Sequence, residues 1–333
     1  MSAPVQLVVS IDTEEDNWQP AREDVRVENA AELPGLHRFL RSLGLRPTYF
    51  VDHPVATHPR ARASLGEIRA EGDGEIGAHL HPWNTPPQDE LFTAGHTMLR
   101  NLPRELQRAK LARLCDALEA ATGARPTAFR AGRFGLGEET VGVLLEAGFR
   151  VDSSVVPFVS WGDVEGADFR GAPLGAYWLD PDTRDLRRPG APGGLRELPL
   201  SCGFTRRPFA WRSRLHGTLR RGALARLPLA GIASRLGLAR RVIVSPELET
   251  LADLLAASRR LVEEGAGVLQ MFWHSPSLVP GLSPFVRDAA ERERLKRRIA
   301  GYVEGVSRFA SVRPATVSEA AEALLPEPVS SAR

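Results

Sequence analysis

The sequence predicts an α/β fold built on a parallel sheet, either open or rolled into a barrel. Apolar runs of strand length alternate with amphipathic helical stretches, and the connections between them are short. Such alternation is typical of right-handed β–α–β crossovers within one parallel sheet. With 333 residues and 43% apolar content, the chain is long enough to bury a large core. We predict a single domain over residues 1–333.

The first half of the chain carries the clearest alternation. Its first strand is rich in valine, as expected of a strand that is buried on both faces. Gly44 follows a helical pattern and is the predicted C-cap of that helix. The predicted strands are 5–11, 47–52, 75–79, 126–130 and 149–151, and the predicted helices are 30–43, 60–70, 103–122 and 138–147.

The second half begins with an interruption of this pattern. Residues 162–245 are dense in glycine and proline and then in arginine, so we predict an insertion or cap there, with one short strand at 195–200. Regular elements resume with a helix that we expect to begin at Ser245 and Pro246. The predicted elements are helix 246–264, strand 267–273, helix 284–309 and strand 315–317, followed by a disordered tail at 326–333.

Polar side chains stand at the end of each strand in the first half. The five runs end in Asp12, Asp52, His79, Arg130 and Asp152. In parallel α/β folds the carboxyl ends of the strands lie at one edge and carry the chemistry. One or two such residues are common at solvated loop starts, but five in succession predict a functional site.

His79 and His81 are the candidate metal ligands. Pro82 pushes the residue before it into extended backbone, and alternate side chains of an extended segment point the same way. Two imidazoles would then converge on one zinc ion, with a carboxylate from residues 14–16 as third ligand and water in the fourth position. The alternative is that the pair consists of two half-exposed polar residues at a strand end.

Other strand-end residues supply the remaining chemistry of a hydrolytic site. Asp12 could accept a proton from water, and Arg130 offers a planar fork that would keep a buried carboxylate ionised. His274, at the end of the strand 267–273, is suited to protonate a leaving group. Each has a structural alternative: Arg130 in a surface salt bridge, His274 as a core histidine and Asp152 as a helix cap.

Composition limits the cellular setting. The chain has two cysteines, Cys115 and Cys202, so we expect no disulfide framework. Its first residues read as a strand rather than a secretion signal, because they lack a basic segment and meet acids directly after a short apolar run. No apolar stretch is long enough to cross a bilayer. We expect a cytoplasmic protein.

The segment Arg206–Arg241 contains ten arginines and no acid. Leucines and an isoleucine recur between them at spacings near four, which predicts amphipathic helices interrupted at Pro228. The segment is either a basic face for an anionic membrane surface or a phosphorylated glycolipid, or a cap with solvated arginines. Nucleic acid is not expected as a partner, because no recognised binding motif accompanies the arginines.

Five segments resemble the ordered motifs of a known family. IDTEED, EIGAHLHP, FRAGRFG, VDSSVVPFVSW and LQMFWH are similar in order and spacing to the motifs of the polysaccharide deacetylase family, also called carbohydrate esterase family four or the NodB-homology domain, and most similar to its WalW-type branch. The resemblance covers residues 5–152 and 195–317. It implies a distorted barrel of about seven parallel strands, and metal-dependent removal of an acetyl group from an N-acetylated sugar.

The same resemblance implies a role for each matching residue. One divalent ion is implied, with zinc expected and cobalt, nickel or iron as alternatives. A backbone amide near Arg133 or Phe134 would stabilise the oxyanion. The implied residues are Asp12 as base, His79 and His81 as ligands, Arg130 as holder of the base, His274 as acid, Asp152 as the fourth motif's aspartate, and Arg133, Phe134, Trp83 and Trp161 as substrate contacts.

Two departures from the family pattern keep alternatives open. The family usually has two adjacent aspartates in its first motif, whereas Asp12 precedes Thr13 here, so the metal carboxylate would be Glu15, with Glu14 or Asp16 as alternatives. The family's histidines are usually separated by three residues and here by one. The expected substrate is an N-acetylated sugar in a cell-surface polysaccharide or lipopolysaccharide precursor. The alternatives are a catalytically silent glycan- or membrane-binding member, or an amidase on a non-sugar amide. No pattern predicts an oligomeric state.

Overall fold

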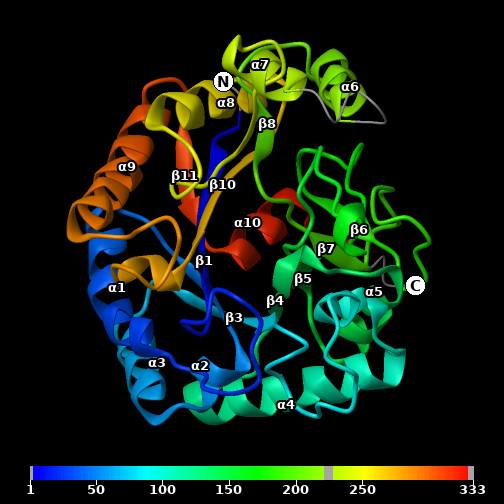
Figure 1. The fold of residues 1–333 in the computed structure, drawn as a ribbon, viewed down its shortest axis with the longest axis vertical. Coiled ribbons are helices and arrows are strands. Elements are labelled where there is room, and N and C mark those ends of the chain that lie inside the picture. The colour runs from blue at the N-terminus through cyan, green and yellow to red at the C-terminus, as the bar shows by residue number, and fades with distance from the viewer. Residues whose placement is uncertain (1–2, 221–227, 329–333) are drawn as a thin grey trace.

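A computed structural model of the chain describes residues 3–220 and 228–328. Nine strands form one sheet in the order β10-β1-β2-β3-β4-β5-β7-β6, and β11 also pairs with β1. All neighbours are parallel except β6 and β7. The sheet curls into a half-barrel (Figure 1), which confirms the predicted fold class. The strands are β1 (Val5–Thr13), β2 (Thr48–Val51), β3 (Glu75–Leu80), β4 (Ala128–Ala131), β5 (Val151–Asp152), β6 (Tyr177–Leu179), β7 (Leu195–Glu197), β10 (Val268–His274) and β11 (Val312–Ala315).

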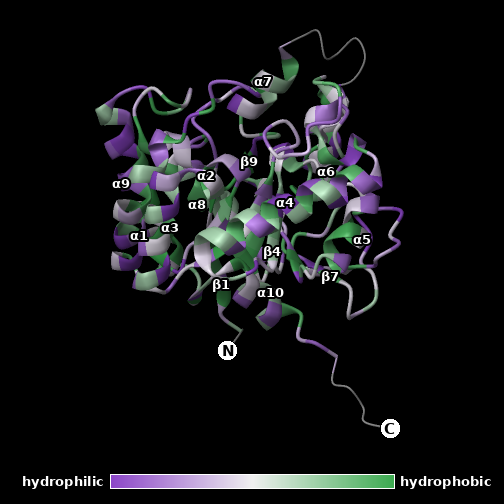
Figure 2. Ribbon diagram, turned by 90° about the horizontal axis from the view of Figure 1, so that it is seen from below, coloured by the Kyte–Doolittle hydropathy of each residue, from purple (hydrophilic) through white to green (hydrophobic). Residues whose placement is uncertain are grey.

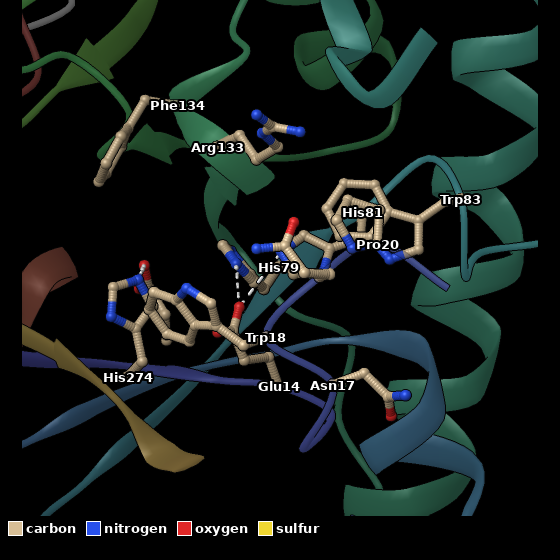
Figure 3. A pocket seen from close by; sticks show the side chains of 12 residues that line it. Glu14, Asn17, Trp18, Pro20, His79, His81, Trp83, Arg133, Phe134 and His274 are labelled. Atoms are coloured by element: carbon tan, nitrogen blue, oxygen red, sulfur yellow. Dashed lines mark ion pairs between the residues drawn. The ribbon is translucent and has the colours of Figure 1, made fainter. Parts of the chain in front are cut away.

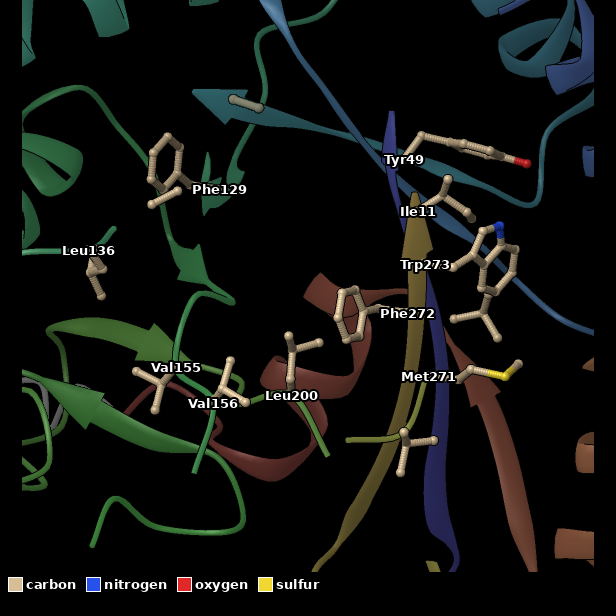
Figure 4. Close-up of a cluster of buried hydrophobic side chains, with 14 of the residues drawn as sticks. Ile11, Tyr49, Phe129, Leu136, Val155, Val156, Leu200, Met271, Phe272 and Trp273 are labelled. Carbon is tan, nitrogen blue, oxygen red and sulfur yellow. The ribbon is translucent and has the colours of Figure 1, made fainter. Parts of the chain in front are cut away.

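Helices form an arc around the outside of the sheet (Figure 1). Alternate residues of each strand face them, because successive side chains of a strand point to opposite faces. Figure 4 shows Ile11, Met271 and Trp273 gathered on one side of β1 and β10, with Phe272 on the other. The helices are α1 (Leu33–Ser42), α2 (His53–Thr57), α3 (Pro59–Glu71), α4 (Arg104–Thr122), α5 (Glu138–Glu146), α8 (Leu251–Glu263) and α9 (Ala289–Ser307).

The interior of the half-barrel is plugged at the amino ends of the strands by α10 (Val317–Leu324). Its apolar face packs against inward-facing residues of the sheet that include Val8, Phe50 and Ala128. Gly77 makes room for this packing, because a Cβ there would lie 2.8 Å from Cδ1 of Phe50. The sequence analysis did not predict this helix.

A buried polar layer lies next along the barrel interior. The guanidinium of Arg130 donates to the hydroxyls of Ser10 and Ser153, each at 3.0 Å. The amide nitrogen of Gln270 donates to the same two hydroxyls at 3.1 and 3.0 Å. The interior therefore changes from apolar at the amino ends of the strands to polar toward their carboxyl ends, where the functional side chains were predicted.

The predicted insertion at 162–245 is divided by the structure. Its first part supplies β6 and β7 to the main sheet, whereas β8 (Cys202–Phe204) and β9 (Arg241–Ile243) form a separate antiparallel pair. Two helices lie between β8 and β9, α6 (Phe209–Leu219) and α7 (Leu229–Arg235), on either side of Pro228 as predicted; residues 221–227 lie outside the described part of the chain. Figure 2 shows α7 at the opposite end of the molecule from α10. Because α10 lies at the amino ends of the parallel strands, α7 lies on the side of their carboxyl ends. Among the described residues, no helix combines the length and apolarity needed to cross a membrane.

Two helices begin five residues later than predicted, α8 at Leu251 and α9 at Ala289, and the error at α8 bears on the candidate site. The predicted helix 246–264 begins only at Leu251, because the Thr250 hydroxyl caps it by accepting from the backbone N–H of Asp253. Residues 246–248 instead form a turn, from which Glu247 contacts His274 at the end of β10. The predicted disordered tail begins with an ordered contact, since Arg196 donates to Glu327 at 2.5 Å, and residues 329–333 lie outside the described residues.

Candidate active site

A cavity of about 260 Å³ lies at the carboxyl ends of β1, β3 and β10. Figure 3 shows the side chains that converge on it. Its volume falls just below the range of about 300 to 1,000 Å³ that is typical of small-molecule sites. The lining residues are Asp12, Glu14, Asn17, Trp18, Gln19, Pro20, His79, His81, Trp83, Arg133, Phe134 and His274.

Glu14, His79 and His81 form a cluster that could hold a metal ion. Oε2 of Glu14 lies 3.6 Å from Nε2 of His79 and 3.3 Å from Nε2 of His81, and the three ligand atoms lie within 4.8 Å of one another. Two imidazoles and one carboxylate, open to a cavity, are the donor set of a catalytic zinc site. Burial in this cluster raises the pKa of Glu14 to about 7, so a bound cation would stabilise its ionised form.

The second ring nitrogen of each histidine is also engaged. Nδ1 of His79 lies 3.1 Å from the carbonyl oxygen of Arg130, and Nδ1 of His81 lies 3.4 Å from Oε2 of Glu15. Such contacts fix the ring orientation and the tautomer of metal-binding histidines. Burial lowers the pKa of His79, which favours the neutral form that a metal requires.

Glu15 faces away from the cavity, and the geometry therefore favours Glu14 as the carboxylate ligand over the Glu15 preferred from sequence. The carboxylate of Glu15 accepts from Nε1 of Trp83 at 3.0 Å and Nδ2 of Asn84 at 2.7 Å. Burial opposes its ionisation, but hydrogen bonds with Asp52 and His81 outweigh burial and lower the pKa of Glu15. Burial and Glu15 together raise the pKa of Asp52 well above its usual range. Glu15 is thus an ionised group that orients His81.

Asp16, the other alternative, also serves a structural purpose. Its carboxylate accepts from the backbone N–H groups of Glu28 and Asn29, at 2.6 and 3.1 Å. These residues begin a short 3-10 helix, η1 (Glu28–Glu32). Asp16 therefore anchors the segment that follows Glu14 and is not a lining residue of the cavity.

Arg130 holds Asp12 in its ionised form. Nη1 of Arg130 donates to Oδ1 of Asp12 at 2.5 Å, and both side chains are almost completely buried. The guanidinium also lies 4.3 Å from the ring centroid of Phe50. Burial raises the pKa of Asp12, but the positive charge of Arg130, with smaller contributions from His79 and His274, outweighs it, so the net shift is downward.

His274 is paired with Asp12 on the adjacent strand, and its Nε2 lies 4.0 Å from Oδ2 of Asp12. Its Nδ1 pairs with Oε2 of Glu247 at 2.9 Å, and its backbone N–H donates to the other oxygen at 3.2 Å. Burial lowers the pKa of His274, but the charge of Glu247, followed by Glu14, raises it to about 10. The raised pKa of His274 favours its protonated form, which faces the carboxylate of Asp12.

The loop after β4 carries the wall of the cavity in η4 (Gly132–Phe134). A residue with a side chain at position 132 would displace His81, because its Cβ would lie 2.0 Å from Cδ2 of that histidine. Arg133 and Phe134 both have φ of +55°, a conformation that costs a non-glycine residue about 1–3 kcal/mol. Trp161 does not line the cavity but stacks behind Phe134, with 5.6 Å between ring centroids.

Lys110 stabilises the loop that follows His81. Its Nζ is fully buried and donates to the carbonyl oxygens of Pro82, Thr85 and Pro87, at 2.9, 2.8 and 2.5 Å. Nζ also lies 3.0 Å from Oε2 of Glu90. A lysine ammonium can direct several donors to converging oxygens in this way, so it fixes the loop backbone beside Glu14, His79 and His81.

Asp152 lies outside the cavity. Its carboxylate accepts from the backbone N–H and hydroxyl of Ser154 at 2.9 and 2.8 Å. Burial raises the pKa of Asp152. Burial and the nearby charge of Asp152 also raise the pKa of Glu197 on the neighbouring strand well above its usual range. Asp152 and Glu197 thus form a buried pair in the sheet. Asp152 is not among the lining residues of the cavity, where its predicted catalytic role would place it.

Sequence reasoning missed two parts of the site. The sequence analysis places Glu247 in a helix. The one sequence feature that could have indicated its contact with His274 is its position directly after Ser245 and Pro246. The segment 17–20 also lines the cavity, and Trp18 packs edge-on against His274 with 5.2 Å between ring centroids. The remaining predicted residues that line the cavity are Asp12, His79, His81, Trp83, Arg133, Phe134 and His274.

Comparison with known proteins bears on the fold. No family model and no curated protein matches this chain. A solved structure described as a polysaccharide deacetylase from Mycobacterium smegmatis is 18% identical, with a TM-score of 0.55 and coverage of 100% of this chain and 96% of that one. A structure described as a glycoside hydrolase/deacetylase from Parabacteroides distasonis is 15% identical, with a TM-score of 0.58 and coverage of 96% and 71%.

The chain shares the fold of these deacetylase structures. We call it the deacetylase fold from here on. At 15–18% identity the likeness extends to the fold alone, and the WalW-type branch stays a prediction.

Proposed function

We propose that the chain is a metal-dependent hydrolase that removes an N-acetyl group from an amino sugar in a glycan or glycolipid precursor. One observation carries the proposal. Three side chains that could hold a metal ion, Asp12 paired with Arg130, and His274 paired with Glu247 meet in one cavity of the deacetylase fold. The small cavity suits an acetamido group and the sugar ring next to it.

Glu14, His79 and His81 would hold the ion, with zinc expected and cobalt, nickel or iron as alternatives. A divalent ion there would polarise the amide carbonyl and make a bound water more acidic. The donor set fits this purpose, since both histidines present Nε2 to the cavity and Glu14 is 12% exposed toward it.

The residues of the chain supply the proton transfers. Asp12 accepts a proton from the attacking water at Oδ2, because Arg130 occupies Oδ1. As the carbon–oxygen bond forms, the backbone amide of Arg133 or Phe134 would donate to the carbonyl oxygen, which gains negative charge. His274 then gives its Nε2 proton to the leaving nitrogen as the carbon–nitrogen bond breaks. The products are acetate and a free amine.

Acetate release from N-acetylhexosamine conjugates tests the proposal directly. We expect release by metal-loaded protein and its loss in Asp12→Asn with metal content preserved. His79→Ala should lose the metal, whereas His274→Ala should keep the metal and lose turnover. A metal-loaded wild-type protein that is inert toward every N-acetylated sugar would refute the proposal. Hydrolysis of non-sugar amides by that protein would favour the amidase, and absence of saturable zinc binding would favour the silent binding protein.

We also propose that the surface around α6 and α7 contacts an anionic membrane, at a cytoplasmic and peripheral location. Four apolar residues are exposed there, Trp211, Ile232, Leu236 and Leu238, at 50, 47, 62 and 41%. Arg206, Arg214 and Arg235 of the same segment are also exposed, and no carboxylate of the described residues lies within 4.0 Å of them. They would attract anionic headgroups.

Several arginines of that segment have structural partners instead. Arg207 pairs with Glu264 at 2.5 Å, and Arg240 pairs with Glu249 and Asp253, each at 2.7 Å. Cosedimentation with vesicles tests the proposal: binding to anionic vesicles should weaken with salt and with Trp211→Ala combined with Leu236→Ala. Equal binding to neutral vesicles, or none, would leave the segment a cap.

A further inference from the structure

We infer that Arg133 recognises an anionic group on the sugar, so the preferred substrate is an acidic N-acetylated sugar that carries a carboxylate or a phosphate. The inference rests on the proposed function for the chemistry at the acetamido group. It concerns the side chain of Arg133, whereas the proposed reaction uses side chains from β1, β3 and β10 and only a backbone amide of the loop after β4.

The first argument is charge. Arg133 is the single arginine or lysine among the residues that line the cavity. Its Nη1 donates to the hydroxyl of Thr97 at 2.9 Å, and within the described residues no carboxylate lies within 4.0 Å of its guanidinium. Neighbouring arginines differ: Arg100 pairs with Glu138 at 3.2 Å and Arg130 with Asp12. Arg133 thus presents an uncompensated positive charge to the cavity.

The second argument is the fixed position of this charge. Arg133 and Phe134 both adopt φ of +55°, and such strained backbone persists where the surrounding structure determines it. Phe134 is held between Trp161 and Phe272, with ring centroids 5.6 and 5.7 Å away. The Thr97 hydroxyl then anchors the guanidinium itself. A side chain ordered before binding loses less entropy when it binds a ligand.

The third argument is the arrangement of the cavity walls. Figure 3 shows Arg133 and Phe134 on the opposite side of the cavity from Trp18 and Glu14. A sugar ring between the aromatic side chains, with its acetamido group at Glu14 and the histidines, would direct another substituent toward Arg133. A guanidinium offers a planar pair of donors that matches a carboxylate or a phosphate, and it is poorly used on a neutral hydroxyl.

Ligand binding tests the inference without requiring hydrolysis. The probes are glucose, glucuronic acid and glucose 6-phosphate, none of which carries an amide, titrated into zinc-loaded protein by calorimetry. We expect at least one acidic sugar to bind about tenfold or more tightly than glucose, the effect of one charged hydrogen bond. Arg133→Gln should remove this difference and Arg133→Lys should keep part of it.

Several results would overturn the inference. Equal binding of glucose and both acids by wild-type protein would do so, as would acid-sugar binding that survives Arg133→Gln, since the anion would then sit on the metal. If Arg133→Gln does not fold, Thr97→Val removes the anchoring hydroxyl instead and should lower the preference. An unchanged preference in Thr97→Val would count against the site.

Turnover separates the two anions and separates this inference from the proposed function. The ratio of kcat/KM is measured for N-acetylglucosamine 6-phosphate and for N-acetylglucosaminuronic acid, each against N-acetylglucosamine. A ratio well above one in wild type that falls toward one in Arg133→Gln supports the inference and identifies the anion. If no sugar is deacetylated but acid-sugar binding still depends on Arg133, the deacetylase proposal fails and the anion site stands.

Discussion

Glu247→Gln is the most informative single change, because it alters the acid of the proposed reaction without touching the cavity. Glu247 is not a lining residue, yet it pairs with Nδ1 of His274 at 2.9 Å and is the largest cause of the raised pKa of that histidine. Glutamine keeps the size and one acceptor oxygen but removes the negative charge. His274 should therefore lose its proton at lower pH.

The size of the shift follows from the bond that is lost. A hydrogen bond to a charged group contributes about 1.5–3 kcal/mol, and one pKa unit corresponds to about 1.36 kcal/mol. The pKa of His274 should thus fall from about 10 by roughly 1–2 units. An ion beside Glu14 will lower the starting value, but it acts on wild type and variant alike.

The assay is the pH dependence of kcat/KM, whose alkaline limb reports deprotonation of the acid in the free enzyme. The limb should move to lower pH in Glu247→Gln. Glu249→Gln is the matched control, since it lies two residues away and pairs with Arg240 instead. An alkaline limb that stays in place, or moves equally in the control, would refute the assignment of His274 as acid.

The same pair predicts how stability varies with pH. Because the pKa of His274 is raised on folding, its contribution is fully present below the unfolded value of about 6.5 and is lost as pH rises through about 10. Chemical denaturation across pH 6 to 10 should therefore show a smaller loss of stability for Glu247→Gln than for wild type.

Three further predictions concern the candidate metal ligands and the residues that position them. Glu14→Gln should abolish saturable zinc binding, whereas Glu15→Gln should weaken it about 10–100-fold, because it removes a contact that orients a ligand. Gly132→Ala should also weaken zinc binding, since the new Cβ would displace a ligand imidazole. Lys110→Met should lower the free energy of unfolding by about 3–5 kcal/mol in urea. It removes the donor to three backbone carbonyl oxygens and leaves Glu90 with Arg22 as its remaining cation.

Matched variants control for general damage. Gly66→Ala adds a Cβ that meets nothing within 4 Å, so zinc binding should be unchanged. Lys296→Met removes the chain's other lysine, which is 40% exposed and lies 3.5 Å from Glu293, and should cost less than about 1 kcal/mol. Equal zinc affinity in Glu14→Gln and Glu15→Gln would show that the ligand has been assigned wrongly, and equal stability losses at Lys110 and Lys296 would contradict the role of the buried cation.

Much of the site followed from the positions of residues along strands. Asp12, His79 and His274 end three parallel strands, so the topology alone brings them to one edge. The choice between Glu14 and Glu15 could also have been made by parity. Asp12 and Glu14 are two residues apart, and alternate residues of an extended segment share a face.

Other parts depended on contacts that sequence periodicity does not encode. The helix ending near residue 264 was predicted to start at Pro246, but capping by Thr250 frees Glu247 to reach His274. The role predicted for Asp152 came from the resemblance to a family motif, whereas in this structure its carboxylate accepts from Ser154 and lies beside Glu197. The plug α10 depends on a barrel interior that only the assembled sheet creates.

The central strand β1 is completed by segments from the far end of the chain. Residues 6–12 pair with β10, and residues 5–8 pair with β11. Asp12 and His274 are separated by about 260 positions, so at about 5–20 residues per second a ribosome needs roughly 10–50 s between them. During that interval β1 has an unsatisfied edge, which makes the nascent chain a candidate client for chaperones. The proposed acid and base can meet only after synthesis has passed residue 274, so chains that end before it should be inert.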